Sequence, residues 1–454
     1  MRKSRPFNAA RGILLLLAII VAPNWGAAQN PRFIRDSEIE ATIRDYATPV
    51  FKAAGLDAQS IDVFLIANDQ LNAFVAGGMN MFLHTGLLQR AEGPLQVMGV
   101  IAHEAGHISG GHIAARRREL RDSTTDMLAT YALGLAAALA TGRSDAGLAV
   151  AQAGQGAVMA NLLAYTRGQE GAADQAAVDY LNDAGYSPEG LLEFMKIMED
   201  QQALLSDNQD PYLRTHPLTQ NRISFLEKAV SKSPHTGDGA PTRLRLEHAR
   251  MTAKLDGFLK PPRETLRKYK GQTDVPGRYA RAIAHFRDAA LDKALAIIDE
   301  LIAEYPKDPY FRELKGQMLY EHGKIAEALP AYEKAVALKP GSALLRLGLA
   351  RTQVQLNESD LNEPALENLG KVLRAEPRNT SAWRLRAIAY GRQGDTGMTA
   401  WSLAEARLTQ GDPQGAIEQS RRAMSLLDKH SPHWLRAQDI RREAKRRIER
   451  REQG

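Results

Sequence analysis

The spacing of apolar residues predicts short strands and several amphipathic helices in the first 260 residues. Positions 36–52 carry apolar side chains at intervals of three and four residues, which is typical of a helix with one buried face. Segments 61–67 and 79–84 have strand-like patterns. We expect further helices at 93–113, 167–184, 188–199 and 243–258, with a polar loop at 231–242. This mixture predicts an α+β domain with a small sheet within a mainly α-helical protein.

A tract at 124–164 departs from the pattern of an ordinary surface helix. Segment 127–141 is rich in Ala and Leu and has no charged residue, and segment 146–164 is rich in Ala, Gly and Gln. Two interpretations are open: a pair of buried or mobile helices, or an interfacial lid that leans on a membrane or on substrate. The first is favoured because Gly and Gln dilute the apolar face.

Beyond Gly277 the chain becomes repetitive. Pro306 and Pro340 are 34 residues apart, and Pro377 follows 37 residues later. Small or aromatic residues recur at fixed offsets before these prolines, namely Ala282, Ala294, Gly316, Ala328, Tyr332, Ala335 and Ala365. The pattern resembles the tetratricopeptide repeat, in four or five copies over 279–428. Such helix pairs cannot bury their apolar faces alone, so they are expected to stack into an α-solenoid, followed by a basic C-terminal helix at 434–451.

The first 28 residues have the layout of a secretory signal peptide. Four basic residues precede or begin an apolar run at 12–22, and small residues at 26–28 precede Gln29. The run is shorter than the roughly 20 apolar residues that span a bilayer, although an uncleaved anchor is the alternative. The chain has no cysteine, which excludes disulfides, and a bacterial periplasm is the expected compartment.

Charge excludes one class of partner. The formal net charge is +6, but four positive charges lie in the leader, so the rest of the chain is near +2. This small excess does not suggest nucleic acid as a partner. Charged residues make up 25% and apolar residues 44% of the 454 positions, which is ordinary for a globular protein.

The segment His103-Glu104-Ala105-Gly106-His107 predicts the zinc site of a peptidase. On a helix, His103 and His107 are one turn apart on the same face, so both imidazoles can bind one zinc ion. Glu104 lies about 100° away, beside the position that zinc leaves open. There its carboxylate can take a proton from a water molecule that zinc activates. Apolar residues at 95–101 indicate that the helix is buried, where two unpaired imidazoles would be costly.

A third protein ligand is expected downstream. Glu170 and Asp174 are four residues apart and share one face of the helix predicted at 167–184. We assign Glu170 to zinc and Asp174 to the second ring nitrogen of a ligand imidazole, with an ordinary helix acid as the alternative for Asp174. His112 is rotated about 140° from His107 on a continuous helix, and it is expected at the surface or beside a ligand.

Three motifs resemble the zinc endopeptidases related to the CAAX prenyl proteases and the heat-shock protease HtpX, over about 36–230. They are His103-Glu-Ala-Gly-His107, Glu170-x-x-Ala-Asp174 and Asn72-Ala73-Phe74 with Gly77-Gly78. The resemblance implies a zincin-type fold with one zinc ion per chain, and a peptide-binding edge strand formed by Met79, Asn80, Met81, Phe82 and Leu83.

The same resemblance implies roles for two further residues. His216 either stabilises the oxyanion of the reaction or caps the open zinc position, and the plain alternative is a turn residue before a helix. Arg222 is expected to contact the oxyanion or a substrate carbonyl. We therefore expect a signal peptide at 1–28, a zinc metallopeptidase domain at 29–260, a linker at 261–278 and a repeat domain at 279–454.

A signal peptide in place of transmembrane helices, together with the repeats, narrows the resemblance to periplasmic members of the family. These features imply an endopeptidase that removes misassembled polypeptides, with outer-membrane proteins or their assembly machinery as partners of the repeats. A peripheral contact with a membrane stays open. The alternative function is a chaperone or scaffold that acts through the repeats while the peptidase is mostly silent.

Overall fold

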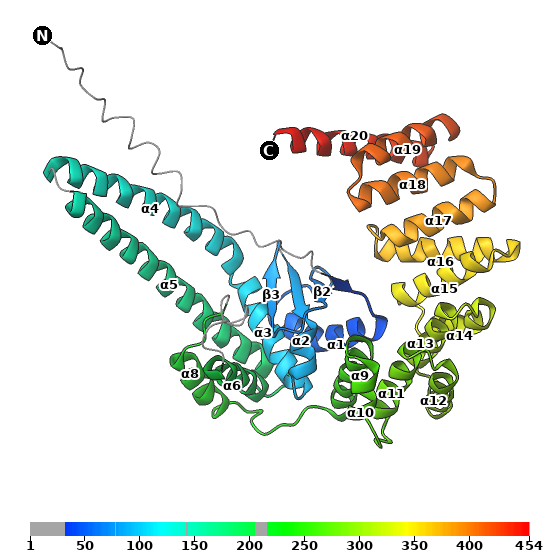
Figure 1. The fold of residues 1–454 in the computed structure, drawn as a ribbon, viewed down its shortest axis with the longest axis horizontal. Coiled ribbons are helices and arrows are strands. Elements are labelled where there is room, and N and C mark those ends of the chain that lie inside the picture. The colour runs from blue at the N-terminus through cyan, green and yellow to red at the C-terminus, as the bar shows by residue number, and fades with distance from the viewer. Residues whose placement is uncertain (1–31, 78, 142–143, 205–215, 454) are drawn as a thin grey trace, which may run out of the picture.

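The computed structural model describes residues 32–77, 79–141, 144–204 and 216–453 (Figure 1). The signal peptide predicted at 1–28 lies outside the described residues. One small sheet lies near the N-terminal end of the described chain, and a helical array forms the C-terminal half. The predicted fold class, mainly α with an α+β domain followed by an α-solenoid, is confirmed. Within the described ranges, no helix is both long enough and apolar enough to cross a membrane.

The sheet has four strands. In spatial order they are β1 (Phe33–Ile34), β2 (Asp62–Ile66), β4 (Asn80–His84) and β3 (Ala73–Ala76). β1 and β3 are antiparallel to their neighbours, whereas β2 and β4 run parallel. The prediction that Met79–Leu83 form an edge strand is wrong, because β4 is paired with β2 on one side and β3 on the other. Among the described residues, β3 instead has an outer edge that no strand covers.

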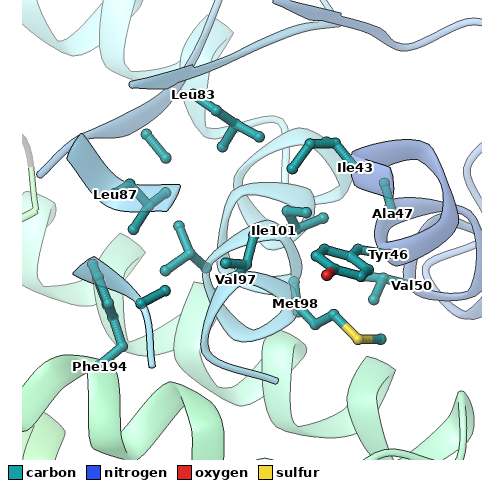
Figure 2. Packing of buried hydrophobic residues seen from close by; sticks show 14 of the residues in the cluster. Ile43, Tyr46, Ala47, Val50, Leu83, Leu87, Val97, Met98, Ile101 and Phe194 are labelled. Carbon is teal, nitrogen blue, oxygen red and sulfur yellow. The ribbon is translucent and has the colours of Figure 1, made fainter. Parts of the chain in front are cut away.

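The core of the N-terminal half lies where the sheet meets α1 (Ser37–Ala53) and α3 (Pro94–Ser109). Tyr46 from α1 and Val97 and Ile101 from α3 are fully buried there (Figure 2). Burying each such side chain stabilises the fold by about 1.5–3 kcal/mol. The helix that carries the histidine pair is therefore fixed by the core of the domain.

Among the described residues, six further helices belong to this half. They are α2 (Thr85–Arg90), α4 (His112–Thr141), α5 (Ser144–Asp183), α6 (Glu189–Leu204), α8 (Gln220–Val230) and α9 (Thr242–Leu259). Of these, α4, α5, α6 and α9 contact α3. The prediction of one continuous helix at 93–113 is wrong, because α3 ends at Ser109 and α4 begins at His112. Gly111 between them has φ +63°, a left-handed conformation that ends a helix and that glycine adopts without strain.

α4 and α5 form a long antiparallel hairpin that projects from the body of the protein (Figure 1). The tract at 124–164 is therefore helical, as predicted. The favoured interpretation, a pair of buried or mobile helices, is wrong as regards burial, since Leu128 and Leu148 are 65% and 59% exposed. The physical reason is that each helix of the projecting part has only the other helix as a neighbour, so most of its circumference faces outward.

The C-terminal half is a stack of helix pairs. It comprises α10 (Pro262–Lys268), α11 (Val275–Arg287), α12 (Leu291–Glu304), α13 (Pro309–Glu321), α14 (Ile325–Leu338), α15 (Ala343–Leu356), a 3₁₀ turn at Ser359–Leu361, α16 (Asn362–Ala375), α17 (Thr380–Arg392), α18 (Thr396–Gln410), α19 (Pro413–Leu426) and α20 (Pro432–Gln453). The predicted repeat positions Ala328 and Tyr332 are buried. Gly316 and Gly348 flank the Tyr332 ring so closely that a Cβ on either would lie 2.8 or 2.6 Å from it. Small residues at these positions therefore let successive helices approach.

A buried set of charges joins the two halves, and we call it the junction cluster. Lys254 on α9 is 1% exposed, and its Nζ lies 2.8 Å from Asp36 and 3.4 Å from Glu38. Arg250 lies 2.6 Å from both Glu38 and Asp308. The cluster is completed by Tyr279, which donates to Glu38, and by Glu313, whose carboxylate lies 3.7 Å from Lys254. Residues of α1, α9, α11 and α13 are thus tied together by buried ion pairs.

Candidate metal centre

Two imidazoles from one face of α3 begin the site. His103 is fully buried and His107 is 8% exposed, and their Nε2 atoms lie 3.1 Å apart. The spacing of four residues on a helix brings the two side chains to the same point. Burial, together with the neighbouring His103 and His216, holds the pKa of His107 well below its usual range. That ring therefore stays neutral, which is the form that binds a metal.

Glu170 reaches the histidines from α5. Its carboxylate oxygens lie 3.3 Å from His103 Nε2 and 3.4 Å from His107 Nε2. Burial alone would raise the pKa of Glu170, but contacts with His103 and His216 hold it well below its usual range. The close approach of the helices depends on Gly106, where a Cβ would lie only 3.0 Å from the Ala173 backbone. The glycine in the motif therefore positions the third predicted ligand.

His216 enters the same point from the segment before α8. Its Nδ1 lies 3.1 Å from Glu170 Oε2 and 3.3 Å from His103 Nε2. Donor atoms of His103, His107, Glu170 and His216 all lie within 4.8 Å of one another. His216 lies in a bend before α8 and is 6% exposed, and its contacts with Glu170 and His103 favour a role in the site over that of a plain turn residue. Residues 205–215, which precede it in the chain, lie outside the described residues.

The spacing of these atoms fits one metal ion. Ligands at about 2.0–2.1 Å from a tetrahedral zinc ion lie about 3.3 Å from one another. The separations here, from 3.1 to 3.4 Å, match that geometry. Burial would lower the pKa of His103, but hydrogen bonds with Asp174 and Glu170 raise it to about 9, so the pocket favours a positive charge. Two imidazoles and a carboxylate, with a third imidazole beside them, are a donor set that holds zinc.

Glu104 lies beside this set and is 1% exposed. One carboxylate oxygen is 3.4 Å from His216 Nε2, and the carboxylate accepts a hydrogen bond from the backbone N–H of Val75 on β3. Burial raises the pKa of Glu104, against the opposing effect of His216 and His103. A carboxylate with a raised pKa beside the ligands is suited to accept a proton from water and give it up again.

Asp174 and Arg222 contact the predicted metal ligands and hold them in position. Asp174 Oδ1 lies 2.9 Å from His103 Nδ1, the ring nitrogen that faces away from the other ligands. Arg222 forms two hydrogen bonds with Asp174, of 2.6 and 2.8 Å, and lies 3.1 Å from Glu170 Oε2. Burial alone would raise the pKa of Asp174, but Arg222 and His103 lower it. The predicted place of Asp174 against a ligand imidazole matches this geometry, whereas Arg222 faces carboxylates of the protein.

His112 lies next to the metal centre, which its angle on a continuous helix does not predict. Its Nδ1 lies 2.9 Å from His107 Nδ1. On a continuous helix the two rings would point about 140° apart, but the break at Gly110-Gly111 turns α4 back toward α3. Of the two expected positions, the structure places His112 beside a ligand. The contact of Val75 with Glu104 was not predicted, because it depends on which strand forms the edge of the sheet.

The residues expected to bind substrate lie within the sheet. Met81 and Leu83 are fully buried, and Phe82 stacks between Phe64 and Phe74 at centroid distances of 5.1 and 4.9 Å. Asn80 donates to the Gly77 carbonyl at 3.3 Å. Met79, which precedes β4, is 44% exposed. Since both edges of β4 are paired, its backbone is not available to an extended peptide.

Comparison with known proteins agrees with this site. Residues 34–230 match peptidase family M48, and residues 277–343 match the tetratricopeptide repeat. The β-barrel assembly-enhancing protease of Yersinia pestis is 25% identical over 335 residues, which cover 73% of this chain and 68% of that protein. The putative β-barrel assembly-enhancing protease of Vibrio cholerae is 24% identical over 374 residues, 80% of this chain and 75% of that one.

The β-barrel assembly-enhancing protease of Escherichia coli K12 is 25% identical over 296 residues, which cover 64% of this chain and 60% of that protein. Each of these alignments is longer than the 34–230 region that matches the peptidase family. The His103, His107 and Glu170 cluster lies inside the matched peptidase region. Residues 34–230 are therefore a metallopeptidase domain of family M48, joined in this chain to tetratricopeptide repeats.

Proposed function

We propose that this protein is a zinc-dependent endopeptidase with one zinc ion per chain. The observation that supports it most directly is the gathering of His103, His107, Glu170 and His216 donor atoms within 4.8 Å, with Glu104 beside them. His103, His107 and Glu170 would hold the ion. Zinc bound there would act as a Lewis acid and lower the pKa of water to about 7.

The protein's own residues supply the proton transfers. Glu104 accepts a proton from the attacking water and delivers it to the amide nitrogen as the peptide bond breaks. Asp174 holds His103 by Nδ1, which leaves Nε2 directed at the metal position. Arg222 positions Asp174 and Glu170 rather than touching substrate. His216 would take the fourth position at rest, since its Nδ1 shows the ligand-to-ligand spacing, and it would have to leave before a substrate carbonyl could approach.

An extended substrate would pair with the outer edge of β3 rather than with β4. The N–H of Val75 already points to Glu104, so this edge faces the metal centre. Backbone groups alternate along a strand, so the carbonyl of Val75 should lie on the same side as its N–H, whereas Ala73 is fully buried. Main-chain pairing of this kind binds many sequences, which suits a peptidase of unfolded polypeptides.

We place the protein in the periplasm, acting on outer-membrane proteins that fail to assemble. The support is the relatives named as β-barrel assembly-enhancing proteases and the leader-like first 28 residues. The repeats would bring clients or their assembly machinery to the peptidase, because stacked helix pairs offer a long concave surface for polypeptides.

The test of the enzyme is Glu104→Gln. The variant should bind zinc in a one-to-one ratio but cleave neither casein nor an unfolded outer-membrane protein, because the amide cannot take up the proton. Glu327→Gln, at an exposed position on α14, serves as the matched control and should cleave normally. Cleavage by wild type should stop with a chelator and return with zinc. Undiminished cleavage by the purified Glu104→Gln protein would disprove the mechanism.

A scaffold function is the second candidate, and the observation that favours it is His216 among the ligands at rest. An enzyme held silent in this way could spend most of its time binding clients through the repeats. Expression of the Glu104→Gln variant in a deletion strain separates the two. Full restoration of outer-membrane integrity would assign the main role to the scaffold, and no restoration would assign it to proteolysis.

A further inference from the structure

The projecting α4–α5 hairpin exposes more large apolar side chains than a free surface element normally does. Seven of them are between 41% and 65% exposed on the distal part, namely Leu128, Tyr131, Leu133, Leu135, Leu148, Val150 and Met159, and Leu163 nearby is 46% exposed. No charged residue occurs at 127–142 or at 146–166. Apolar surface on this scale marks a site of interaction.

The packing inside the hairpin is the reverse of that in a water-soluble helical pair. Small residues lie in the seam between the helices: Ser123 and Ala151 are buried, and a Cβ on Gly154 would collide with the side chain of Thr130. The large leucines point outward instead. Small residues between helices and large apolar residues outside are the arrangement of helices surrounded by lipid.

Most of the exposed apolar residues are arranged in stripes, whereas Leu133 on α4 and Val150 on α5 lie outside them. On α4, Arg121, Leu128, Tyr131 and Leu135 fall within about 80° of the helix circumference, and on α5, Leu148, Met159, Leu163 and Arg167 fall within about 100°. The acidic residues Glu119, Asp122 and Asp126 of α4 are centred on the opposite side of that helix. Each stripe therefore has an arginine at its end near the body of the protein and apolar residues beyond it.

Both stripes lie on the same side of the hairpin. Measured from the seam residues Ser123 and Thr130 on α4 and Ala151 and Gly154 on α5, each stripe is rotated by about 130–140° in the same sense along its own helix. In an antiparallel pair, equal rotations bring the two stripes to one face. We call this the hairpin face: Arg121, Leu128, Tyr131, Leu135, Leu148, Met159, Leu163 and Arg167.

We propose that the hairpin face docks on a bilayer that contains anionic phospholipids. The leucines enter the acyl region, and the exposed Arg121 and Arg167 meet phosphate groups. The charge-free part of α4 at 127–141 is about 22 Å long, shorter than the roughly 30 Å hydrocarbon core. Charged residues also bound it at both ends, Asp126 on one side and Arg143 on the other. The hairpin therefore lies along the interface instead of crossing the bilayer.

A single labelled cysteine tests this directly, because the natural chain has no cysteine. Leu135→Cys, carrying an environment-sensitive fluorophore, is mixed as full-length purified protein with vesicles of phosphatidylethanolamine and phosphatidylglycerol. Its emission should shift to the blue and be quenched by spin-labelled lipid. Leu426→Cys, a similarly exposed leucine on α19, is the matched control and should not change.

Lipid binding should also depend on the two classes of residue in the hairpin face. Leu128→Gln, Leu135→Gln and Leu163→Gln combined should lower the fraction that sediments with vesicles about tenfold or more. The control combines Leu246→Gln, Leu426→Gln and Leu435→Gln, which are exposed elsewhere, and it should bind as wild type does. Arg121→Gln with Arg167→Gln should weaken binding about fivefold for each arginine, and only to vesicles with phosphatidylglycerol.

Three outcomes would overturn the proposal. A fluorescence change with unfolded polypeptide but not with vesicles would assign the hairpin face to clients. A change that grows with protein concentration without lipid would assign it to a second copy of the chain. Equal loss of sedimentation in both leucine triples would show that the hairpin face has no special part in binding. None of these readouts depends on peptidase activity, so the test is independent of the proposed enzyme.

Discussion

At the scale of single residues, successive contacts extend from the metal centre. His103 contacts Asp174, and Asp174 contacts Arg222. His103 and Asp174 could be predicted, since each lies four residues from another site residue on its own helix, His107 and Glu170 respectively. No local pattern in the sequence predicts where His216 and Arg222 lie. They precede α8 or belong to it, and the approach of α8 to α5 is set by tertiary packing. Their expected involvement came from the family resemblance, and the role expected for Arg222 differs from its position.

Replacing Asp174 by Asn should weaken metal binding. The amide cannot accept from both His103 Nδ1 and Arg222 as the carboxylate does, so the imidazole loses its orientation. We expect zinc affinity, measured by competition with a chromophoric chelator, to fall about 10–100-fold. Asp179→Asn, at an exposed position on the same helix, is the control and should leave affinity unchanged. Unchanged affinity in the Asp174 variant would show that its contact with His103 is dispensable.

Replacing His216 by Ala should raise proteolysis. If His216 holds the fourth position at rest, its removal opens that position while His103, His107 and Glu170 keep the metal. The rate of casein cleavage or self-cleavage at equal zinc content measures the effect. His235→Ala, outside the metal centre, should behave as wild type. A fall of about 100-fold or more would assign His216 to the oxyanion instead.

At the scale of elements, the helical periodicity was informative and the boundaries were less so. The break at Gly110-Gly111 was concealed, because glycine is permitted in a helix and only its φ in the fold reveals the turn. The identity of the edge strand was mistaken, since strand order depends on how β3 folds back on β4 and not on alternation within either strand. Exposure of α4 and α5 was also missed, as composition alone does not show how many neighbours a helix has.

Because α3 and α5 pack closely, substitutions at two glycines should have opposite effects on stability. Gly106→Val should destabilise the protein and weaken zinc binding, because its side chain would push Ala173, and with it Glu170, away from the histidines. Gly168 lies on α5 and has open space where a Cβ would be. Gly168→Ala should therefore stabilise α5 by about 0.5–1 kcal/mol. Thermal unfolding and zinc competition on both variants provide the measurement. Similar effects of the two changes would contradict the close approach described here.

On the scale of the whole molecule, the junction cluster fixes the peptidase domain to the repeats. Its members come from residues 36–38, 250–254 and 279–313, and ion pairs between such distant positions cannot be read from the pattern of a sequence. The repeat architecture itself could be predicted, because each unit restates the same spacing. The spacing of the repeats does not predict the contacts between the two halves. These contacts also include an ion pair of Arg35 with Glu376 at 2.7 Å.

The junction cluster should make stability depend on pH through Glu313. Burial raises its pKa to about 7 despite the opposing effect of Lys254, with Asp36 and Glu38 adding to the rise. Since the folded pKa exceeds the unfolded value of about 4.3, this contribution to stability is complete at low pH and is lost as pH rises to about 7. Glu38 and Lys254 keep their charges there, because the pKa of Glu38 is lowered and that of Lys254 is raised.

Glu313→Gln removes this titration. The Tm of the variant relative to wild type should therefore increase between pH 5 and pH 8, by an amount on the order of a few degrees. Glu327→Gln is again the matched control, and its offset from wild type should stay flat over the same range. A Glu313→Gln offset that does not change with pH would show that the carboxyl group titrates as it does in water.

The continuity of α5 limits how the hairpin can vary in length. The helix runs for 40 residues from Ser144 to Asp183, so Leu148 and Glu170 are joined without a hinge. Inserting one residue between them would turn the outward face by about 100° relative to the metal centre, whereas inserting seven, two full turns, would leave it within about 20°. Chains that keep both ends in phase can therefore lengthen or shorten this arm only in steps of about two turns, with α4 changing by a matching length.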